Sequence, residues 1–289
     1  MCQIRFLLAS GPFFIEPKTG RSTNRKSFRS FLERYIREED PVMITRHHMA
    51  LALMCALILC SAFFLSNPLM MALVIAGTCI GVLLPDIQMT RPKHHSLRTV
   101  AWLIVQFPRR IYAPALCRIY SHTRHPVPDP ADKRLIHSIP GVLFVYACTC
   151  VLLLIPSYAT GNVLITRSAA AFLGGVILGM GLHLVEDLCT RKGIFPFFPF
   201  SPWMVSGSIR PCDKTDPRIA QYHIQHCTVL LVFFGLDNLG ILAPELFLPI
   251  SIAGLGICLG TMVYFSEISI RCDPGSAGDV KIPSPAKST

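Results

Sequence analysis

The chain has 289 residues, of which 52% are hydrophobic and only 15% are charged, and its formal net charge is +10. Soluble domains have about 25% charged residues, so this composition excludes an ordinary soluble domain and favours a protein whose solvent is lipid. A basic chain can bind nucleic acid, but Lys and Arg are also enriched in the cytoplasmic loops of membrane proteins. We therefore expect membrane lipids as partners and no nucleic acid. The 12 cysteines include no Cys-x-x-Cys pair, which excludes a zinc ribbon or a thioredoxin-like site.

Residues 1–46 form a basic segment that precedes the first long apolar run. From Ser27 to Arg37, apolar residues recur at i, i+3, i+4, i+7 and i+8, with charged residues between them. This period predicts an amphipathic helix. Such a helix lies on the bilayer surface or packs against the cytoplasmic face of the protein itself.

Residues 47–270 are predicted to form a transmembrane domain, because their apolar runs approach the length of about 17 to 25 residues that crosses a bilayer. The fold class that follows is an all-α integral membrane protein, a bundle of about six (five to six) transmembrane helices with cytoplasmic amphipathic helices. The long connections 85–138 and 189–226 are expected at the cytoplasmic surface, and the tail 271–289 is expected to be disordered. The predicted spans are Met49–Leu65, Leu69–Leu84, Ile139–Ile155, Ser168–Leu188 and two within Cys227–Ile270, with a turn at Pro244–Pro249.

The distribution of basic residues predicts the orientation of these spans. Of the 27 Lys and Arg residues, 26 lie before the first span, in the two long connections or in the tail, and one, Arg167, lies on the other side. The positive-inside rule then places both termini and both long connections in the cytoplasm. We therefore expect a multi-pass protein of the inner or plasma membrane.

Metal-ligand-type residues gather at the predicted cytoplasmic ends of the spans. Each alone has an ordinary explanation as a cap, a snorkelling side chain or a terminal turn. Ionisable residues at the apolar end of a span, however, are costly and usually mark a functional site, and the topology brings several of them to one membrane depth. They are His47 and His48 at the first span, Asp86 after the second, His137 before the third, and His183, Glu186 and Asp187 at the end of the fourth.

His183 and Asp187 are four residues apart, so they lie on one face of a helix. This spacing fits two ligands of one metal ion, although such pairs are also common as simple hydrogen bonds. Imidazole mixed with carboxylate suits a divalent ion, zinc first, with manganese or iron as alternatives.

The motifs around these residues resemble the YdjM-like family, the LexA-regulated, inner-membrane-bound metal-dependent hydrolases. The resemblance covers about residues 47–203. It rests on His48 at the start of the first span and on three sequence motifs, Leu83-Leu84-Pro85-Asp86-Ile87, Lys133-Arg134-Leu135-Ile136-His137-Ser138, and the stretch from Gly179 to Gly193 that contains His183, Glu186 and Asp187. The sequence has Gln88, Asp132 and Ile136 where the family has a second Asp, a His and a Thr.

The resemblance implies a metal-dependent hydrolase that acts on an ester or phosphoester, such as a phospholipid, at the cytoplasmic membrane face. The implied metal ligands are His48, Asp86, His137, His183 and Asp187. Glu186 or Asp132 would act as the general base, and Ser138 and Thr190 would orient ligands. A lipid phosphate would meet Arg134, Arg191 or Lys192.

Two other classes of function remain open on the sequence. A transporter would need polar residues near the middle of the bilayer, and Asp237-Asn238 is the candidate, although Gly235 and Gly240 beside it indicate a broken or re-entrant helix. A noncatalytic membrane scaffold would use the basic N-terminal segment and the long connections to bind lipid or a protein partner.

Overall fold

The computed structural model describes residues 40–60, 67–86, 110–122, 132–211, 213 and 215–272. The predicted amphipathic helix at Ser27–Arg37 and the position Gln88 lie outside these residues. Residues 1–41 and 42–289 form two separate units, and the following description concerns the second unit. The domain limits at 46 and 270 stay predictions.

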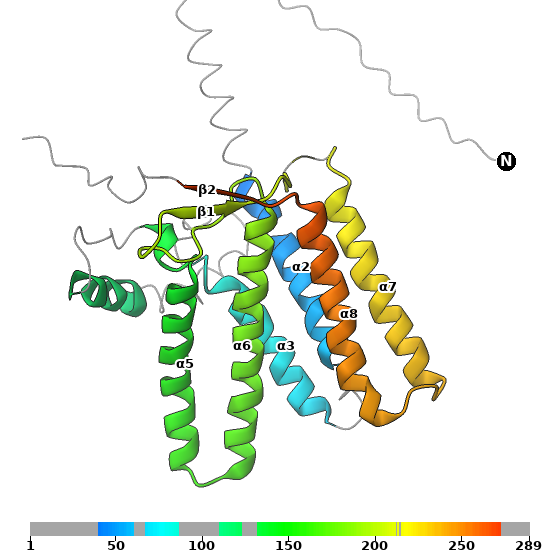
Figure 1. Cartoon of the computed structure of the whole chain (residues 1–289). Helices are drawn as coiled ribbons and strands as arrows, with labels where there is room; N and C mark the ends of the chain where they lie inside the picture. Colours follow the sequence, from blue (N-terminus) through cyan, green and yellow to red (C-terminus); the bar gives the residue numbers. More distant parts are fainter. Residues whose placement is uncertain are drawn as a thin grey trace, which may run out of the picture. The chain divides into compact units, whose positions relative to one another are not determined.

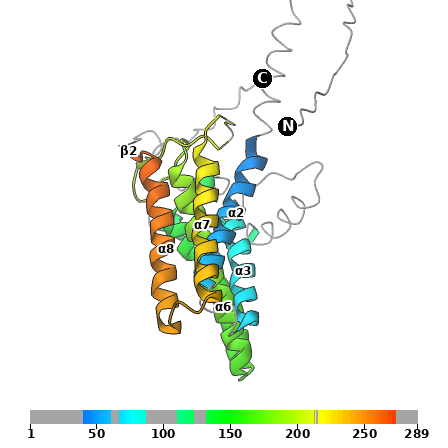
Figure 2. The ribbon, with the colours of Figure 1, turned by 90° about the vertical axis from the view of Figure 1, so that its right-hand side faces the viewer.

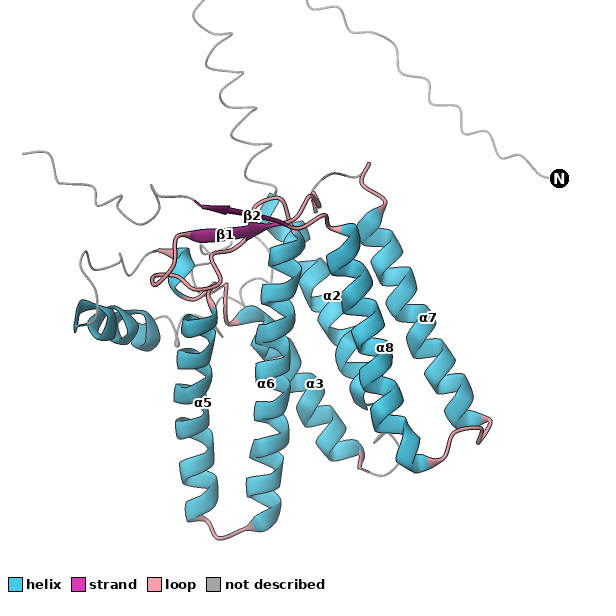
Figure 3. Ribbon diagram, viewed as in Figure 1, coloured by secondary structure: helices cyan, strands magenta, loops and turns pink. Residues whose placement is uncertain are grey.

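The described chain is helical, which confirms the predicted fold class of a helical membrane protein, and the helices run side by side (Figure 1, Figure 2). An additional short helix covers residues 110–122. Two short strands, which the sequence analysis did not predict, pair antiparallel with Trp203 opposite Cys272 (Figure 3). The elements are α2 (Asp40–Cys60), α3 (Pro68–Leu83), the 3₁₀ turn η2 (Lys133–Leu135), α5 (Ile139–Ala159), α6 (Val163–Cys189), β1 (Trp203–Ser206), α7 (Arg218–Asn238), α8 (Pro244–Phe265) and β2 (Ser269–Cys272).

Among the described helices, α5, α6, α7 and α8 are long and apolar enough to cross a membrane. The apolar part of α2, Arg46–Cys60, and α3 are shorter apolar helices. Membrane embedding is therefore supported, while the number of six spans and the cytoplasmic orientation of the termini stay predictions.

The predicted turn at Pro244–Pro249 is wrong in its position. Pro244 opens α8 at its first turn, Pro249 lies inside that helix, and the break in the chain falls at residues 239–243. Proline fits the first turn of a helix, where its missing N–H has no partner to lose. The predicted interruption at Gly235 and Gly240 is wrong for Gly235, since α7 continues to Asn238; Gly240, with a positive φ of 62°, lies just beyond the end of the helix. Asp237 thus ends a continuous helix.

The helices α3 and α6 are parallel and touch through their backbones. A Cβ atom on Gly77 or Gly81 would overlap the carbonyl oxygen of Phe172 or Val176, and a Cβ on Gly175 or Gly179 would overlap an α3 carbonyl. Small residues at this spacing allow close helix contact in a membrane. The register pairs each α3 residue with one almost a hundred positions later, so Asp86, just beyond α3, falls beside His183.

We call the end of the bundle where α3 and α6 both end the site end; it is the upper end in Figure 1. At this end Ser138 caps α5 by accepting from Gly141 N at 3.2 Å and donating to Leu135 O at 3.0 Å. Thr190 ends α6, and its hydroxyl donates to Asp187 O at 2.8 Å. The two residues expected to orient ligands therefore fix the backbone beside His137 and Asp187.

Candidate metal centre

Four elements bring the predicted metal ligands together at the site end. α2 provides His48, the turn after α3 provides Asp86, the turn between η2 and α5 provides His137, and the last turns of α6 provide His183 and Asp187. Among the described residues, Asp86, His137 and His183 form a group whose ligand atoms all lie within 4.8 Å of one another, close enough to hold one metal ion.

Asp187 lies at the centre of this cluster. Its Oδ2 is 3.4 Å from His183 Nε2 and 3.5 Å from His137 Nε2, and its Oδ1 is 3.3 Å from His48 Nε2. On the other side, His137 Nε2 is 3.4 Å from Asp86 Oδ1. A chain of contacts thus joins the five residues that the resemblance implied as ligands, and their role as ligands stays a prediction.

These separations are longer than direct hydrogen bonds between the same groups, which are about 2.7 to 3.2 Å long. Two atoms bound to one zinc ion at about 2.1 Å in tetrahedral geometry lie about 3.4 Å apart. The Asp86–His137 and His183–Asp187 distances, both 3.4 Å, match that spacing. The side chains are therefore spaced as ligands around a common point.

Unmatched polar atoms in the cluster also fit a cation. Neither ring nitrogen of His183 forms a hydrogen bond, although its side chain is only 2% exposed. Glu186 Oε1 is buried without a hydrogen-bond partner as well. Leaving a buried polar group unsatisfied costs about 1 to 3 kcal/mol, and a bound ion that accepts the His183 lone pair would remove that cost.

The orientation of His137 supports a ligand role. Its Nδ1 lies 3.2 Å from Lys133 O and donates to it, so Nε2 is the nitrogen that faces Asp86 and Asp187. A second ring nitrogen that donates to a carbonyl is the usual arrangement of a metal-binding histidine.

The Asp86 carboxyl, beyond the end of α3, is ionised at neutral pH. Burial disfavours its charge, but the neighbouring imidazoles of His137 and His183 outweigh this effect and lower the pKa of Asp86 to about 2. An ionised carboxylate is the form that binds a divalent cation.

Glu186 and His48 form a buried pair on the side of Asp187 away from Asp86. His48 Nδ1 is 2.5 Å from Glu186 Oε2, both side chains are 5% exposed, and the His48 ring stacks on His183 with 4.6 Å between centroids. A cavity of about 40 Å³ adjoins this pair and is otherwise lined mainly by apolar side chains, including Leu51, Ile209 and Met262.

Asp132 has a different environment from the other predicted residues. Both of its carboxylate oxygens accept hydrogen bonds from Arg134, at 2.7 to 3.1 Å, and it caps the η2 turn. Arg134 in turn lies over the rings of Phe195 and Phe198. With its oxygens bound to Arg134, Asp132 is a poor candidate for the base, and its catalytic assignment stays a prediction. Ile136, at the family's Thr position, is fully buried in the apolar core.

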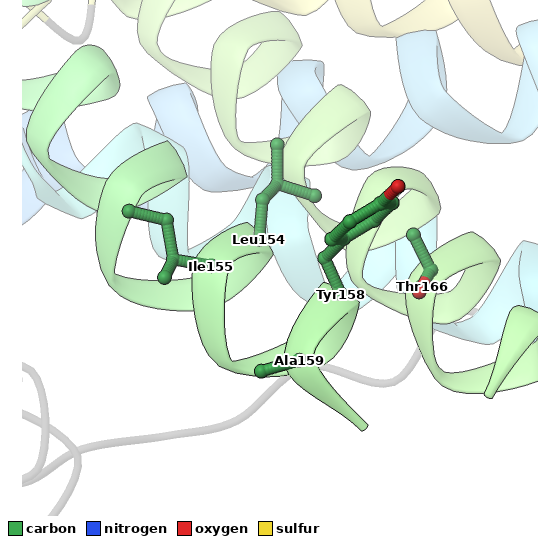
Figure 4. Close-up of a pocket in the computed structure, with 5 residues that line it drawn as sticks. All are labelled: Leu154, Ile155, Tyr158, Ala159 and Thr166. Atoms are coloured by element: carbon green, nitrogen blue, oxygen red, sulfur yellow. The ribbon is translucent and has the colours of Figure 1, made fainter. Parts of the chain in front are cut away.

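An open pocket elsewhere in the described part of the chain is separate from this cluster. It has a volume of about 470 Å³ and lies between the end of α5 and the start of α6, where Tyr158 and Thr166 are its polar lining residues (Figure 4). None of its lining residues has a side chain that readily binds a metal ion, and it lies at the end of the bundle opposite the site end (Figure 1).

The sequence analysis missed a second group of histidines at the site end. The rings of His47 on α2 and His223 on α7 are in edge-to-face contact, with centroids 5.4 Å apart, and His226 lies one turn further along α7. The spacing His223-x-x-His226 on an apolar helix was the signal that could have revealed this group.

A known protein family has the same sequence pattern over most of the chain. The model of the family described as YdjM inner membrane protein matches residues 43–264. The chain belongs to this family. No curated protein and no solved structure matches the chain, so the family match and the geometry of the cluster are the basis for its function. The YdjM match extends beyond residues 47–203, over which the resemblance was stated, and includes α7 and nearly all of α8.

Proposed function

We propose that this YdjM-family protein is a membrane-bound metal-dependent hydrolase that cleaves an ester or phosphoester at the membrane surface. The observation that carries the proposal is the buried, unsatisfied His183 beside Asp86, His137 and Asp187 at ligand-like spacing. A His and carboxylate donor set fits zinc, with manganese or iron as alternatives. When bound, such an ion polarises an acyl or phosphoryl oxygen and lowers the pKa of water.

The other roles, which are binding the ion, orienting its ligands and accepting a proton, belong to side chains of the cluster. Asp86, His137, His183 and Asp187 hold the ion, and His48 orients Asp187 through the contact at 3.3 Å. Glu186 uses one oxygen to bind His48 and keeps Oε1 free of hydrogen bonds. Oε1 is therefore the proton acceptor that the cluster offers to an attacking water molecule.

The position of the cluster favours a lipid phosphoester as the substrate. Arg191 and Lys192 are exposed on the turn directly after α6, a helix long and apolar enough to cross a membrane, so at its end they are suited to meet a lipid phosphate. Arg134 is a weaker candidate for phosphate binding because its guanidinium already binds Asp132. The positive-inside prediction would place this chemistry on the cytoplasmic leaflet.

The test combines metal content with activity in the intact, detergent-solubilised protein. We expect one divalent ion per chain in this cluster and slow hydrolysis of a fluorogenic phosphodiester or phospholipid. The Asp187→Ala variant should lose both the ion and the activity, because Asp187 contacts three histidines. Asp237→Asn, which changes a carboxylate at the opposite end of α7, is the matched control and should lose neither.

Substitution of Glu186 tests the proposed general base independently of the proposed metal ligands. Glu186→Gln should keep the ion and lose at least about 100-fold in rate, the usual contribution of a general base. Retention of the ion by Asp187→Ala would refute the metal centre. Full metal binding without hydrolysis of any ester tested would leave the scaffold or transport alternatives as the better explanation.

A further inference from the structure

The helices α2 and α7 place three imidazoles together at the site end, outside the cluster around Asp187. His47 lies on α2, and His223 and His226 lie three residues apart on α7, so that they share one side of that helix. The His47 and His223 rings meet at 5.4 Å with an interplanar angle of 66°. None of the three belongs to the Asp86–His137–His183 group.

Each of the two α7 histidines is hydrogen-bonded to the backbone through Nδ1, which leaves Nε2 available for a ligand. His223 Nδ1 is 2.7 Å from Ile219 O, and His226 Nδ1 is 2.7 Å from Tyr222 O. Because a carbonyl only accepts, each Nδ1 donates, and Nε2 is the ring nitrogen left to bind an ion. His137 in the main cluster is anchored by a carbonyl four residues earlier in the same manner.

His226 shows that this arrangement is incomplete without a ligand. Its side chain is fully buried, and its Nε2 has no hydrogen-bond partner. A buried, unpaired acceptor costs about 1 to 3 kcal/mol. A histidine that served only to fill space between α7 and its neighbours would be replaced by an apolar side chain without that cost.

We propose that His47, His223 and His226 form a second transition-metal site, distinct from the centre around Asp187. The His47 and His223 rings already meet, and binding of one ion by all three side chains requires a change of rotamer, because the three do not form a ligand-spaced group among the described residues. The site contains imidazole nitrogen and no carboxylate, so it selects zinc, nickel or copper over manganese or magnesium, which prefer oxygen ligands. His47 also lines the cavity that adjoins Glu186 and His48.

The difference in donor chemistry provides the test. The intact, metal-depleted protein is dialysed against Zn²⁺ or Mn²⁺, and the bound metal is counted by mass spectrometry. We expect Zn²⁺ to bind with one equivalent more than Mn²⁺. His223→Ala should lose that extra zinc equivalent and leave Mn²⁺ binding unchanged, whereas Asp187→Ala should keep it.

The matched control is His122→Ala. His122 is exposed on the helix at residues 110–122 and has the same Nδ1 contact to a carbonyl four residues earlier, at 2.8 Å. Zinc binding should not change in this variant. His47→Gln and His226→Gln, each checked by thermal unfolding, replace His223→Ala if that variant does not fold.

Equal binding of Zn²⁺ and Mn²⁺ by the wild type would overturn the proposal, as would an undiminished zinc count in folded His223→Ala and His47→Gln variants. These outcomes do not depend on the hydrolase proposal, since the Asp187→Ala protein reports on the second site alone.

Discussion

The two helix pairs α3–α6 and α7–α8 are held together in different ways. α3 and α6 approach so closely that four glycines are in backbone contact. α7 and α8 are joined by side chains instead, with Gln225 Nε2 donating to Thr261 Oγ1 at 2.6 Å and Tyr222 OH donating to Met262 O at 3.3 Å. The ligand cluster extends from the α3–α6 pair, where positions are fixed by the backbone. The second histidine group depends on α7, whose position depends on softer contacts.

The largest expected effect comes from adding bulk between α3 and α6. Gly179→Val would push side-chain atoms into Thr78 O and separate the two helices, with a loss of stability of more than about 3 kcal/mol, beyond usual overpacking costs. Thermal unfolding in detergent measures the change, and metal binding should fall with it because Asp86 moves away from His183. Gly181→Val, on the same helix with open space around its Cα, is the control. Equal stability of the two variants would contradict the backbone-contact account.

A smaller loss of stability is expected when the N-cap of α5 is removed. Ser138→Ala removes the N-cap hydrogen bond to Gly141 N and the bond to Leu135 O. Loss of a cap costs about 1 kcal/mol, which thermal unfolding would detect. Ser157→Ala removes a hydroxyl that bonds only within its own helix and should be milder; the reverse order would argue against the capping role.

A double-mutant cycle measures the weaker contact between α7 and α8. Gln225→Leu and Thr261→Val, alone and together, should give a coupling of about 0.6 kcal/mol, the typical value for a hydrogen bond between membrane helices. Unfolding in denaturant provides the four free energies. A coupling as large as the Gly179→Val effect would remove the distinction between the two pairs.

The smallest effect depends on pH. Hydrogen bonds from Arg218 outweigh burial and lower the pKa of Asp216, in the loop before α7, to about 2. Asp216 therefore stabilises the folded state above its unfolded pKa of about 3.9, and this contribution is lost as the pH falls toward 2. Asp216→Asn should be slightly less stable than the wild type at pH 7 and equal to it near pH 2. Because the ion pair lies near the surface, with the Arg218 side chain 26% exposed, the difference amounts to tenths of a kcal/mol. A difference that does not change with pH would exclude the ionic contribution.

Much of the bundle and of the cluster follows from sequence patterns. The apolar run predicted at Ile139–Ile155 became α5 with the same first residue, because Ser138 and Pro140 are strong helix-start signals. The meeting of His48, Asp86, His137, His183 and Asp187 was predictable because spans of similar length bring their ends to one depth.

Other features depend on contacts that no local pattern reveals. Asp132 bonds to Arg134 two residues later, which competes with a role in catalysis and depends on rotamers. The pairing of Trp203 with Cys272 joins segments far apart in sequence. His223 and His226 were missed because their partner, His47, lies on a different helix, and only the packing of α2 against α7 brings them together.

The parallel contact of α3 with α6 also has a consequence for biogenesis. His48 and Glu186 are 138 residues apart, and the last of the proposed ligands, Asp187, leaves the ribosome only after α2, α3 and α5 have been synthesised. A nascent chain that ends before α6 has His48, Asp86 and His137 without the helix that joins them. For the metal centre proposed above, loading would therefore be a late event of membrane insertion that waits for the completed α6.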